Sequence, residues 1–207
     1  MGAQAYHIIS ELNLDSDAVI LEIGAERGEG STQHFYNFCE KNNLCFITVD
    51  FEVQAVNRAK YISRDGILNQ WAFVYHSTGE DFLENVFPTM DKKITFAYLD
   101  NFDWLWEGSE SDSFYGPARV LYQSYGIEMN NKNSQLAHLE QAKLVNKFSS
   151  ENCHILLDDT YENTAGDYNG KGGMAVPYLL SKNWNIINQY DTTQTMHLGW
   201  YLLKKGV

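Results

Sequence analysis

Four short apolar runs, separated by polar segments of helical length, restrict the fold of this chain more than any other feature. They occupy residues 19–25, 45–51, 71–77 and 94–100. The runs do not alternate strictly between apolar and polar residues, which is typical of strands buried on both faces of a parallel sheet. Because helical segments separate them, the sequence predicts an α/β fold with a doubly wound sheet and helices on both of its faces.

Further along the chain the same reading predicts three more strands, so the sheet should have seven. They are residues 153–159, 184–190 and 196–205, and the polar turn at 191–195 makes the last two antiparallel. The sheet should therefore be mostly parallel and end in an antiparallel strand. Helical spacing predicts helices at residues 3–13, from Ser31 onward, and at 53–63, 79–87, 134–149 and 174–182.

In two segments the apolar residues follow neither the spacing of a helix nor that of a strand. Residues 104–132 are rich in Ser, Gly and aromatic residues, and so long a connection inside a domain is usually a binding loop or a lid. Its aromatic side chains either form a wall of a substrate site or pack as core; they are Trp104, Trp106, Tyr115, Tyr122 and Tyr125. A second loop is predicted at 160–173, and its Gly-rich part, 166–173 with Lys171, either folds over a ligand or is a plain connector.

The charge of the chain limits its partners. It has 27 Asp and Glu against 15 Lys and Arg, a formal net charge of −12, and no basic stripe. Binding to a phosphate backbone depends on Lys and Arg, so nucleic acid is an improbable partner and a small molecule is favoured. Whether copies of the chain associate is left open.

Length and apolar content set the remaining bounds. The 207 residues, 44% of them hydrophobic, predict one domain spanning 1–207, with residues 104–132 as a lid-like insertion. No run reaches the roughly 20 apolar residues of a membrane helix, and the start of the chain lacks the pattern of a signal peptide. We therefore expect a soluble cytoplasmic protein that does not bind membranes.

The most informative motif joins the first predicted strand to the helix that follows. It reads Glu22-Ile-Gly24-Ala25-Glu26-Arg-Gly28-Glu-Gly30-Ser31-Thr32. Glycines let the backbone turn tightly and approach a ligand, and the following helix presents free N–H groups. Asp50 ends the second predicted strand, where a carboxylate can accept both hydroxyls of a ribose. A Gly-rich turn also occurs without any ligand, but together the two features indicate a nucleoside-containing cofactor.

The spacing of the glycines bears on which cofactor is bound. A dinucleotide site has the pattern GxGxxG, which this turn lacks. Glu26 lies within the turn, where its charge would repel a pyrophosphate but suit an ammonium or sulfonium group. The turn therefore favours a cationic ligand.

With this motif, Asp50, the segment STGED at 77–81 and the antiparallel C-terminal strand, nearly the whole chain resembles the class I S-adenosylmethionine-dependent methyltransferases. The resemblance implies a Rossmann-like sheet and S-adenosylmethionine as cofactor. Glu26 departs from the commonest pattern, since it stands in place of the middle glycine. The cofactor-binding residues that it implies are Glu22, Gly24, Ala25, Gly28, Gly30, Ser31, Asp50, Phe51, Gly79, Glu80 and Asp100.

Within this class the chain is most similar to the small-molecule O-methyltransferases of the catechol, caffeoyl-CoA and antibiotic-sugar types. Their metal-binding positions match Asp100, Asp158 and Asp159, so the resemblance implies a divalent metal ion. The residues themselves support this expectation, because carboxylates at neighbouring strand ends converge and three oxygen donors suit Mg²⁺ or Ca²⁺. The alternative is that these Asp residues cap helices or turns.

Asp103 lies where the catechol-type enzymes carry a lysine that acts as general base, so the resemblance breaks at this point. Asp103 either accepts the proton instead or is a solvated loop residue. We count Asp100 and Asp103 as the candidate catalytic residues.

The sequence thus predicts a methyltransferase that transfers a methyl group to a hydroxyl of a small molecule with metal assistance. A first alternative is a catalytically inactive protein of the same fold that binds a ligand or a protein, which the missing lysine and the unusual lid motivate. A second is an NAD-dependent oxidoreductase, against which the absent GxGxxG pattern argues.

Overall fold

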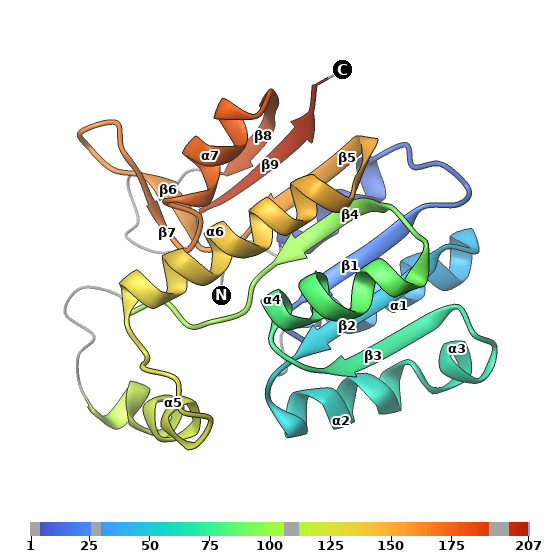
Figure 1. The fold of residues 1–207 in the computed structure, drawn as a ribbon, viewed down its shortest axis with the longest axis horizontal. Helices are drawn as coiled ribbons and strands as arrows, with labels where there is room; N and C mark the ends of the chain where they lie inside the picture. The colour runs from blue at the N-terminus through green and yellow to red at the C-terminus, as the bar shows by residue number, and fades with distance from the viewer. Residues whose placement is uncertain (1–4, 26–29, 106–111, 191–198, 207) are drawn as a thin grey trace.

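The computed structural model describes residues 5–25, 30–105, 112–190 and 199–206, and its centre is one seven-stranded sheet (Figure 1). The first five strands pair in parallel, whereas β9 runs antiparallel to both of its neighbours. This confirms the predicted sheet. In spatial order the strands are β3 (Ala72–His76), β2 (Cys45–Asp50), β1 (Val19–Ile23), β4 (Ile94–Leu99), β5 (Ser149–Leu157), β9 (Trp200–Lys205) and β8 (Trp184–Tyr190).

The central strands are apolar throughout because helices cover both faces of the sheet. In β1 every residue is buried, and alternate side chains enter different cores. Leu21 and Ile23 face one core, and Ile20 faces the other.

Each core is completed by its own set of helices. On the face of Leu21 lie α4 (Gly79–Asp81), the π turn η2 (Phe82–Val86), the 3-10 turn η3 (Phe87–Met90), α6 (Asn131–Phe148) and α7 (Ala175–Ser181). On the face of Ile20 lie η1 (Ala5–Glu11), α1 (Ser31–Asn42), α2 (Val53–Ile62) and, next to β3, the short α3 (Arg64–Leu68). In the described part of the chain, no helix is long and apolar enough to cross a membrane.

The segments expected to be irregular contain regular structure. Within 104–132 the chain forms the helix α5 (Asp112–Ser124). The sequence did not indicate this helix because Gly116 and Pro117, two residues that disfavour helices, lie inside it. Within the predicted loop 160–173, β6 (Thr160–Glu162) and β7 (Tyr168–Gly170) pair as a two-stranded hairpin. Both expectations of an irregular segment were wrong in part.

Other boundaries differ by a few residues. The leading helix is a 3-10 helix, and β5 begins at Ser149, before the predicted 153, because its exposed polar residues hide the start of the strand. The predicted turn at 191–195 and the first residues of the predicted strand 196–205 lie outside the described residues.

Figure 1 shows the carboxyl ends of the parallel strands on one side of the sheet, where α5 and the β6–β7 hairpin also lie. At this edge β1 passes into its turn at Gly24, which has φ +100°. A Cβ at Gly24 would lie 2.6 Å from the backbone N of Asn101 and 2.8 Å from the backbone O of Asp100. Only glycine therefore allows the ends of β1 and β4 to approach this closely.

Gly24→Ala should lower the free energy of unfolding by about 3 kcal/mol, since it adds a steric overlap with backbone to the strain of a positive φ. Gly126→Ala is the matched control, because Gly126 has φ +73° but open space around it, and should cost about 1–2 kcal/mol. Urea denaturation of the two variants measures the difference. Equal losses of stability would show that the contact with β4 is unimportant.

Two buried histidines tie the stability of the fold to pH. His138 on α6 is fully buried, and its Nδ1 donates to the backbone O of Ser134 over 2.8 Å. Burial, and then the positive charge of Lys171, lower the pKa of His138 to about 4. Burial and Lys204 lower the pKa of His154 on β5 to about 4 as well. Both side chains are therefore neutral in the folded protein above this pH.

Because the unfolded chain takes up a proton at His138 near pH 6.5 and the folded chain only near pH 4, stability should be complete above pH 6.5 and fall between these values. The loss from His138 should be roughly 3 kcal/mol. His138→Asn, which keeps a donor for Ser134, should flatten this part of the profile, and replacing exposed His76 by Asn should not. Urea denaturation from pH 7 to pH 4 measures both, and identical profiles would contradict the assignment.

Candidate functional site

Acidic side chains collect at the carboxyl edge of the sheet, at the ends of four neighbouring strands. Open α/β sheets bind their ligands at this edge. A buried carboxylate needs hydrogen-bond donors or a positive charge nearby, so its contacts reveal how it is used. The acidic residues of this edge are Glu22 of β1, Asp50 of β2, Asp100 after β4, and Asp158 and Asp159 after β5.

Glu22 is fully buried and joins three elements. Its Oε1 accepts a hydrogen bond from Ser31 Oγ at 2.7 Å, and its Oε2 accepts from Thr32 Oγ1 at 2.7 Å and Thr48 Oγ1 at 2.6 Å. The two Glu22 oxygens thereby hold the start of α1 and the middle of β2 against β1. Ser31 thus has its hydroxyl directed at Glu22.

Asp50 closes the other side of the same turn. Its Oδ2 accepts the backbone N–H of Ala25 at 2.8 Å, and its Oδ1 accepts the backbone N–H of Glu52 at 2.6 Å. Gly30, with φ +95°, precedes the first residue of α1. The structure thus brings Ala25 and Asp50 into contact beside Gly24, and Gly30 precedes α1, whereas Gly28 lies outside the described residues.

The residues expected beside the cofactor at 51 and 79–80 occupy the same edge. Phe51 packs against Tyr122 of α5, with 5.1 Å between ring centroids, and its ring lies 5.2 Å from that of Tyr125. Gly79 is buried, and a Cβ there would overlap the side chain of Ile23. Gln141 Nε2 donates to Glu80 Oε1 over 3.0 Å, and burial raises the pKa of Glu80.

Lys171 reaches the acidic cluster from the turn after β7. Its Nζ lies 2.6 Å from Asp100 Oδ1 and 3.0 Å from Asp159 Oδ2, and its side chain is only 5% exposed. Burial acts to lower the pKa of Lys171, but Asp100 and Asp159 more than offset it and hold this pKa well above its usual range. The ammonium is therefore a permanent charge of the site.

Tyr98 of β4 bridges the other carboxylates. Its hydroxyl lies 2.9 Å from Asp100 Oδ2 and 2.5 Å from Asp158 Oδ2. Burial, followed by the two carboxylates, raises the pKa of Tyr98 well above its usual range, so Tyr98 is a phenol at neutral pH. Burial, followed by Asp100 and Asp159, raises the pKa of Asp158 well above its usual range.

The backbone holds Lys171 in this position. The N–H of Lys171 donates to the backbone O of Asp159 at 2.9 Å. Gly170, with φ +76°, packs so closely on Asp159 that a Cβ would overlap the Asp159 carbonyl oxygen. Asp159 itself has φ +45°, which is uncommon for a residue with a side chain. The hairpin and the end of β5 thus form one fitted unit.

These contacts do not fit the divalent metal that the sequence predicts at Asp100, Asp158 and Asp159. Among the described residues, no group of three or more His, Cys, Asp or Glu side chains is arranged to hold a metal ion. The physical reason is that the Lys171 ammonium bonds two of the three carboxylates and the Tyr98 hydroxyl bonds the third. A cation would have to displace Lys171 to reach them.

The same edge does fit a cationic nucleoside cofactor. Asn101 is buried, and its Oδ1 accepts no hydrogen bond from any described part of the protein. An unpaired buried acceptor beside Asp100 suits the ammonium of a methionine group. The Asp50 carboxylate lies at the end of β2, where two backbone N–H groups hold it.

The segment after β4 positions the remaining candidates. Phe102 has φ +63°, and the backbone N–H of Asp103 donates to Tyr122 Oη at 2.8 Å. Burial raises the pKa of Asp159 most, and the nearby carboxylates of Asp100 and then Asp103 add to this increase. Asp103 therefore belongs to the acidic edge.

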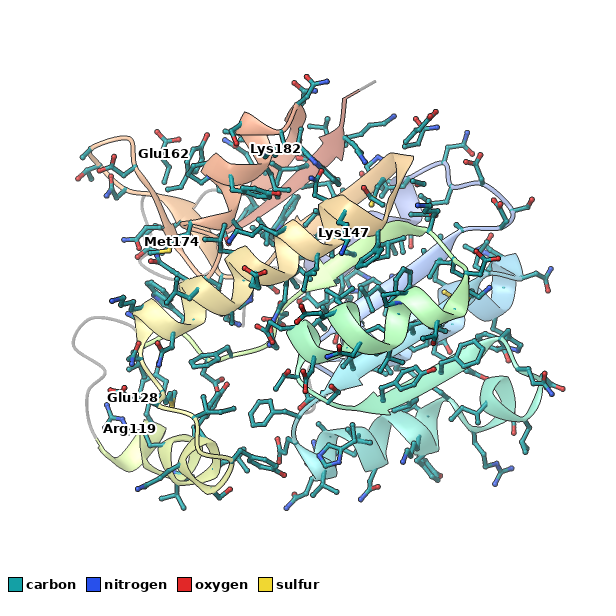
Figure 2. All side chains as sticks on the ribbon, viewed as in Figure 1. Arg119, Glu128, Lys147, Glu162, Met174 and Lys182 are labelled. Carbon is teal, nitrogen blue, oxygen red and sulfur yellow. The ribbon has the colours of Figure 1, made fainter. Side chains whose placement is uncertain are left out.

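The aromatic residues of the expected substrate wall are for the most part packed inside. Trp104, Tyr115 and Tyr122 are buried, and Tyr115 Oη donates to the backbone O of Trp104 at 3.2 Å. Tyr125 is 40% exposed, and Trp106 lies outside the described residues. Figure 2 shows Arg119 of α5 and Glu128 of the segment after it at a distance from the sheet.

Tyr98 and Thr48 were not foreseen as site residues, because each lies inside an apolar strand run and only the neighbouring strand shows what its hydroxyl meets. Asn101 was likewise missed, although its place beside Asp100 was a signal. Lys171 was a candidate, but nothing in the sequence connects it to Asp100.

No protein-family model matches the sequence, and the search of curated proteins finds no match either. Solved structures do match. The rRNA methylase from Streptococcus thermophilus has a TM-score of 0.60 at 11% identity, with 97% of this chain and 94% of that chain covered. The O-methyltransferase from Bacillus cereus, in complex with S-adenosylhomocysteine (SAH), has a TM-score of 0.58 at 13% identity, with 98% and 80% covered.

A third similar structure is M. capricolum TrmK in complex with SAH, with a TM-score of 0.56 at 12% identity and coverage of 97% and 66%. At these identities the similarity establishes the fold and not the substrate. The chain therefore has the Rossmann-like fold of the S-adenosylmethionine-dependent methyltransferases.

Proposed function

We propose that this protein is an S-adenosylmethionine-dependent methyltransferase that methylates a hydroxyl oxygen of a small molecule. The observation that carries the proposal is the arrangement of Gly24, Asp50 and Asn101 around the ends of β1, β2 and β4. In similar structures with this fold, SAH is bound. We leave a divalent metal out of the proposal because Lys171 bonds the carboxylates that would hold it.

The residues of the turn take separate roles. Asp50 binds the ribose hydroxyls, and its bonds to the N–H groups of Ala25 and Glu52 keep its carboxylate in place. Phe51, Gly79 and Glu80 lie on the adenine side, while Asn101 and Asp100 face the ammonium of the methionine group. Glu22 and Ser31 act by holding the turn, since their side chains bond each other.

When bound, the cofactor supplies a methyl group on a positively charged sulfur. The acceptor oxygen must lie in line with that methyl, and its proton must leave to a base. We assign the base role to Asp103, which belongs to the same acidic edge as Asp159. Asp100 is not assigned as the base because its two oxygens already bond Lys171 and Tyr98. Its role in the proposal is to position the ligand.

Asp50→Asn should weaken SAH binding about 10- to 100-fold, since the variant loses hydrogen bonds between a charged acceptor and the ribose hydroxyls. Asp65→Asn is the matched control, because Asp65 is exposed on α3, and it should bind SAH as the wild type does. Isothermal titration calorimetry measures both affinities. Thermal melting of each variant in the absence of SAH shows whether the fold is kept.

The same titration distinguishes the rival functions. Binding of NAD in preference to SAH would support an oxidoreductase, and no binding of either by the wild type would contradict the proposal. A wild type that binds SAH but transfers no methyl group from S-adenosylmethionine to any compound of a hydroxyl-containing panel would support an inactive binding module.

One observation favours a second substrate class, namely the similarity to the rRNA methylase from Streptococcus thermophilus. The net charge of −12 opposes binding to phosphate backbones, so we retain the small molecule as the proposed acceptor. In a filter-binding assay at about 0.1 M salt, the SAH-loaded protein should retain no more total bacterial rRNA than serum albumin does. Specific retention of rRNA would contradict a small-molecule acceptor.

A further inference from the structure

Three carboxylates, those of Asp100, Asp158 and Asp159, are gathered at the ends of β4 and β5, and all three are partly buried. Such a group repels itself strongly unless a positive charge lies within it. A divalent ion is one way to supply that charge, and a side chain of the same protein is another. This chain contains only 15 Lys and Arg, and one of these lysines is buried at the cluster.

We propose that the ammonium of Lys171 takes the place of the divalent cation in this methyltransferase fold, so that the acidic cluster excludes divalent metal ions. This inference rests on the proposed function in one respect, because it takes the acidic cluster to be part of the site where the acceptor is methylated. Its physical basis is independent of that function and lies in the contacts of Lys171.

The distances support a cation that is part of the fold. Lys171 Nζ lies 2.6 Å from one oxygen of Asp100 and 3.0 Å from one oxygen of Asp159. These are short charge-assisted contacts, and Lys171 is only 4% exposed. A divalent ion would need the same oxygens, so the ion and the ammonium cannot both occupy the cluster.

The β6–β7 hairpin holds Lys171 next to the carboxylates. Pairing of Thr160 with Gly170 ends β7 immediately before Lys171. The N–H of Lys171 bonds the carbonyl of Asp159, and Gly172 N–H bonds Thr160 Oγ1 at 3.0 Å. The backbone on both sides of the lysine is therefore tied to the strand end that carries the carboxylates.

Other oxygens of the cluster also have internal donors. The hydroxyl of Tyr98 lies between the second oxygen of Asp100 and one oxygen of Asp158. The backbone N–H of Asp159 donates to the other oxygen of Asp158 at 2.9 Å. At least one oxygen of each carboxylate thus has an internal donor, and the described residues form no group of three or more acidic, His or Cys side chains arranged to hold a cation.

The test is Mn²⁺ binding by the SAH-loaded protein. The electron paramagnetic resonance signal of free Mn²⁺ measures how much of the ion remains unbound. In the wild type, any weak Mn²⁺ binding should be the same with and without the Asp159 carboxylate. Lys171→Met should bind Mn²⁺ with an affinity at least about tenfold higher than this residual wild-type affinity. Removing the ammonium leaves three carboxylates that a divalent ion can neutralise. Lys171→Met combined with Asp159→Asn should lose this binding again.

Lys182→Met is the matched control, because Lys182 is exposed at the end of α7, as Figure 2 shows, and should leave Mn²⁺ binding unchanged. SAH titration of each variant reports separately on the proposed function. Failure to bind SAH would contradict that function. The Mn²⁺ affinities of the wild type and Lys171→Met would then be compared in the protein without SAH.

Two outcomes overturn the inference. One is a wild type that binds Mn²⁺ as tightly as Lys171→Met does and loses it in Asp159→Asn. The other is a folded Lys171→Met that gains no Mn²⁺ affinity. Should Lys171→Met fail to fold, the wild type compared with Asp159→Asn decides: Mn²⁺ binding that depends on Asp159 overturns the inference, and its absence supports it.

Discussion

The structure depends on how buried carboxylates are neutralised at one edge of the sheet. A parallel sheet covered on both faces brings the ends of β1, β2, β4 and β5 close together, and an acidic residue lies at or near each of these ends. Removing a carboxylate from water is costly unless donors or charges replace the water. The molecule provides a different replacement at each position, and these replacements determine what the edge can bind.

Glu22 shows the first solution, in which three neutral hydroxyls hold a fully buried carboxylate. The hydroxyls come from α1 and β2, so the charge of Glu22 also fixes the turn between them. Asp50 shows the second, in which backbone N–H groups are the donors. These two bonds set the position of the Asp50 carboxylate at the end of β2.

Asp100 and Asp159 show the third solution, in which a buried lysine from a distant turn supplies a positive charge. This arrangement changes the expected chemistry of the site. Three carboxylates at neighbouring strand ends indicate a metal when the sequence is considered alone, and the ammonium of Lys171 satisfies the same electrostatic requirement without one. The acidic edge still favours a cationic cofactor, since the nearby Asn101 Oδ1 is a buried acceptor.

The amino-acid sequence by itself determined the order of the main-sheet strands along the chain, the parallel character of the sheet and the edge where the acidic residues meet. It could do so because apolar runs and helical spacing are local patterns, and because strand ends in such a sheet converge. Only the tertiary structure decided the partners of those carboxylates. Lys171 lies 71 residues from Asp100 in the chain, and the β6–β7 hairpin that delivers it has too few residues to leave a periodic signal. The helix α5 was hidden for a related reason, since Gly116 and Pro117 weaken its local pattern while its packing on Phe51 and Phe102 holds it in place.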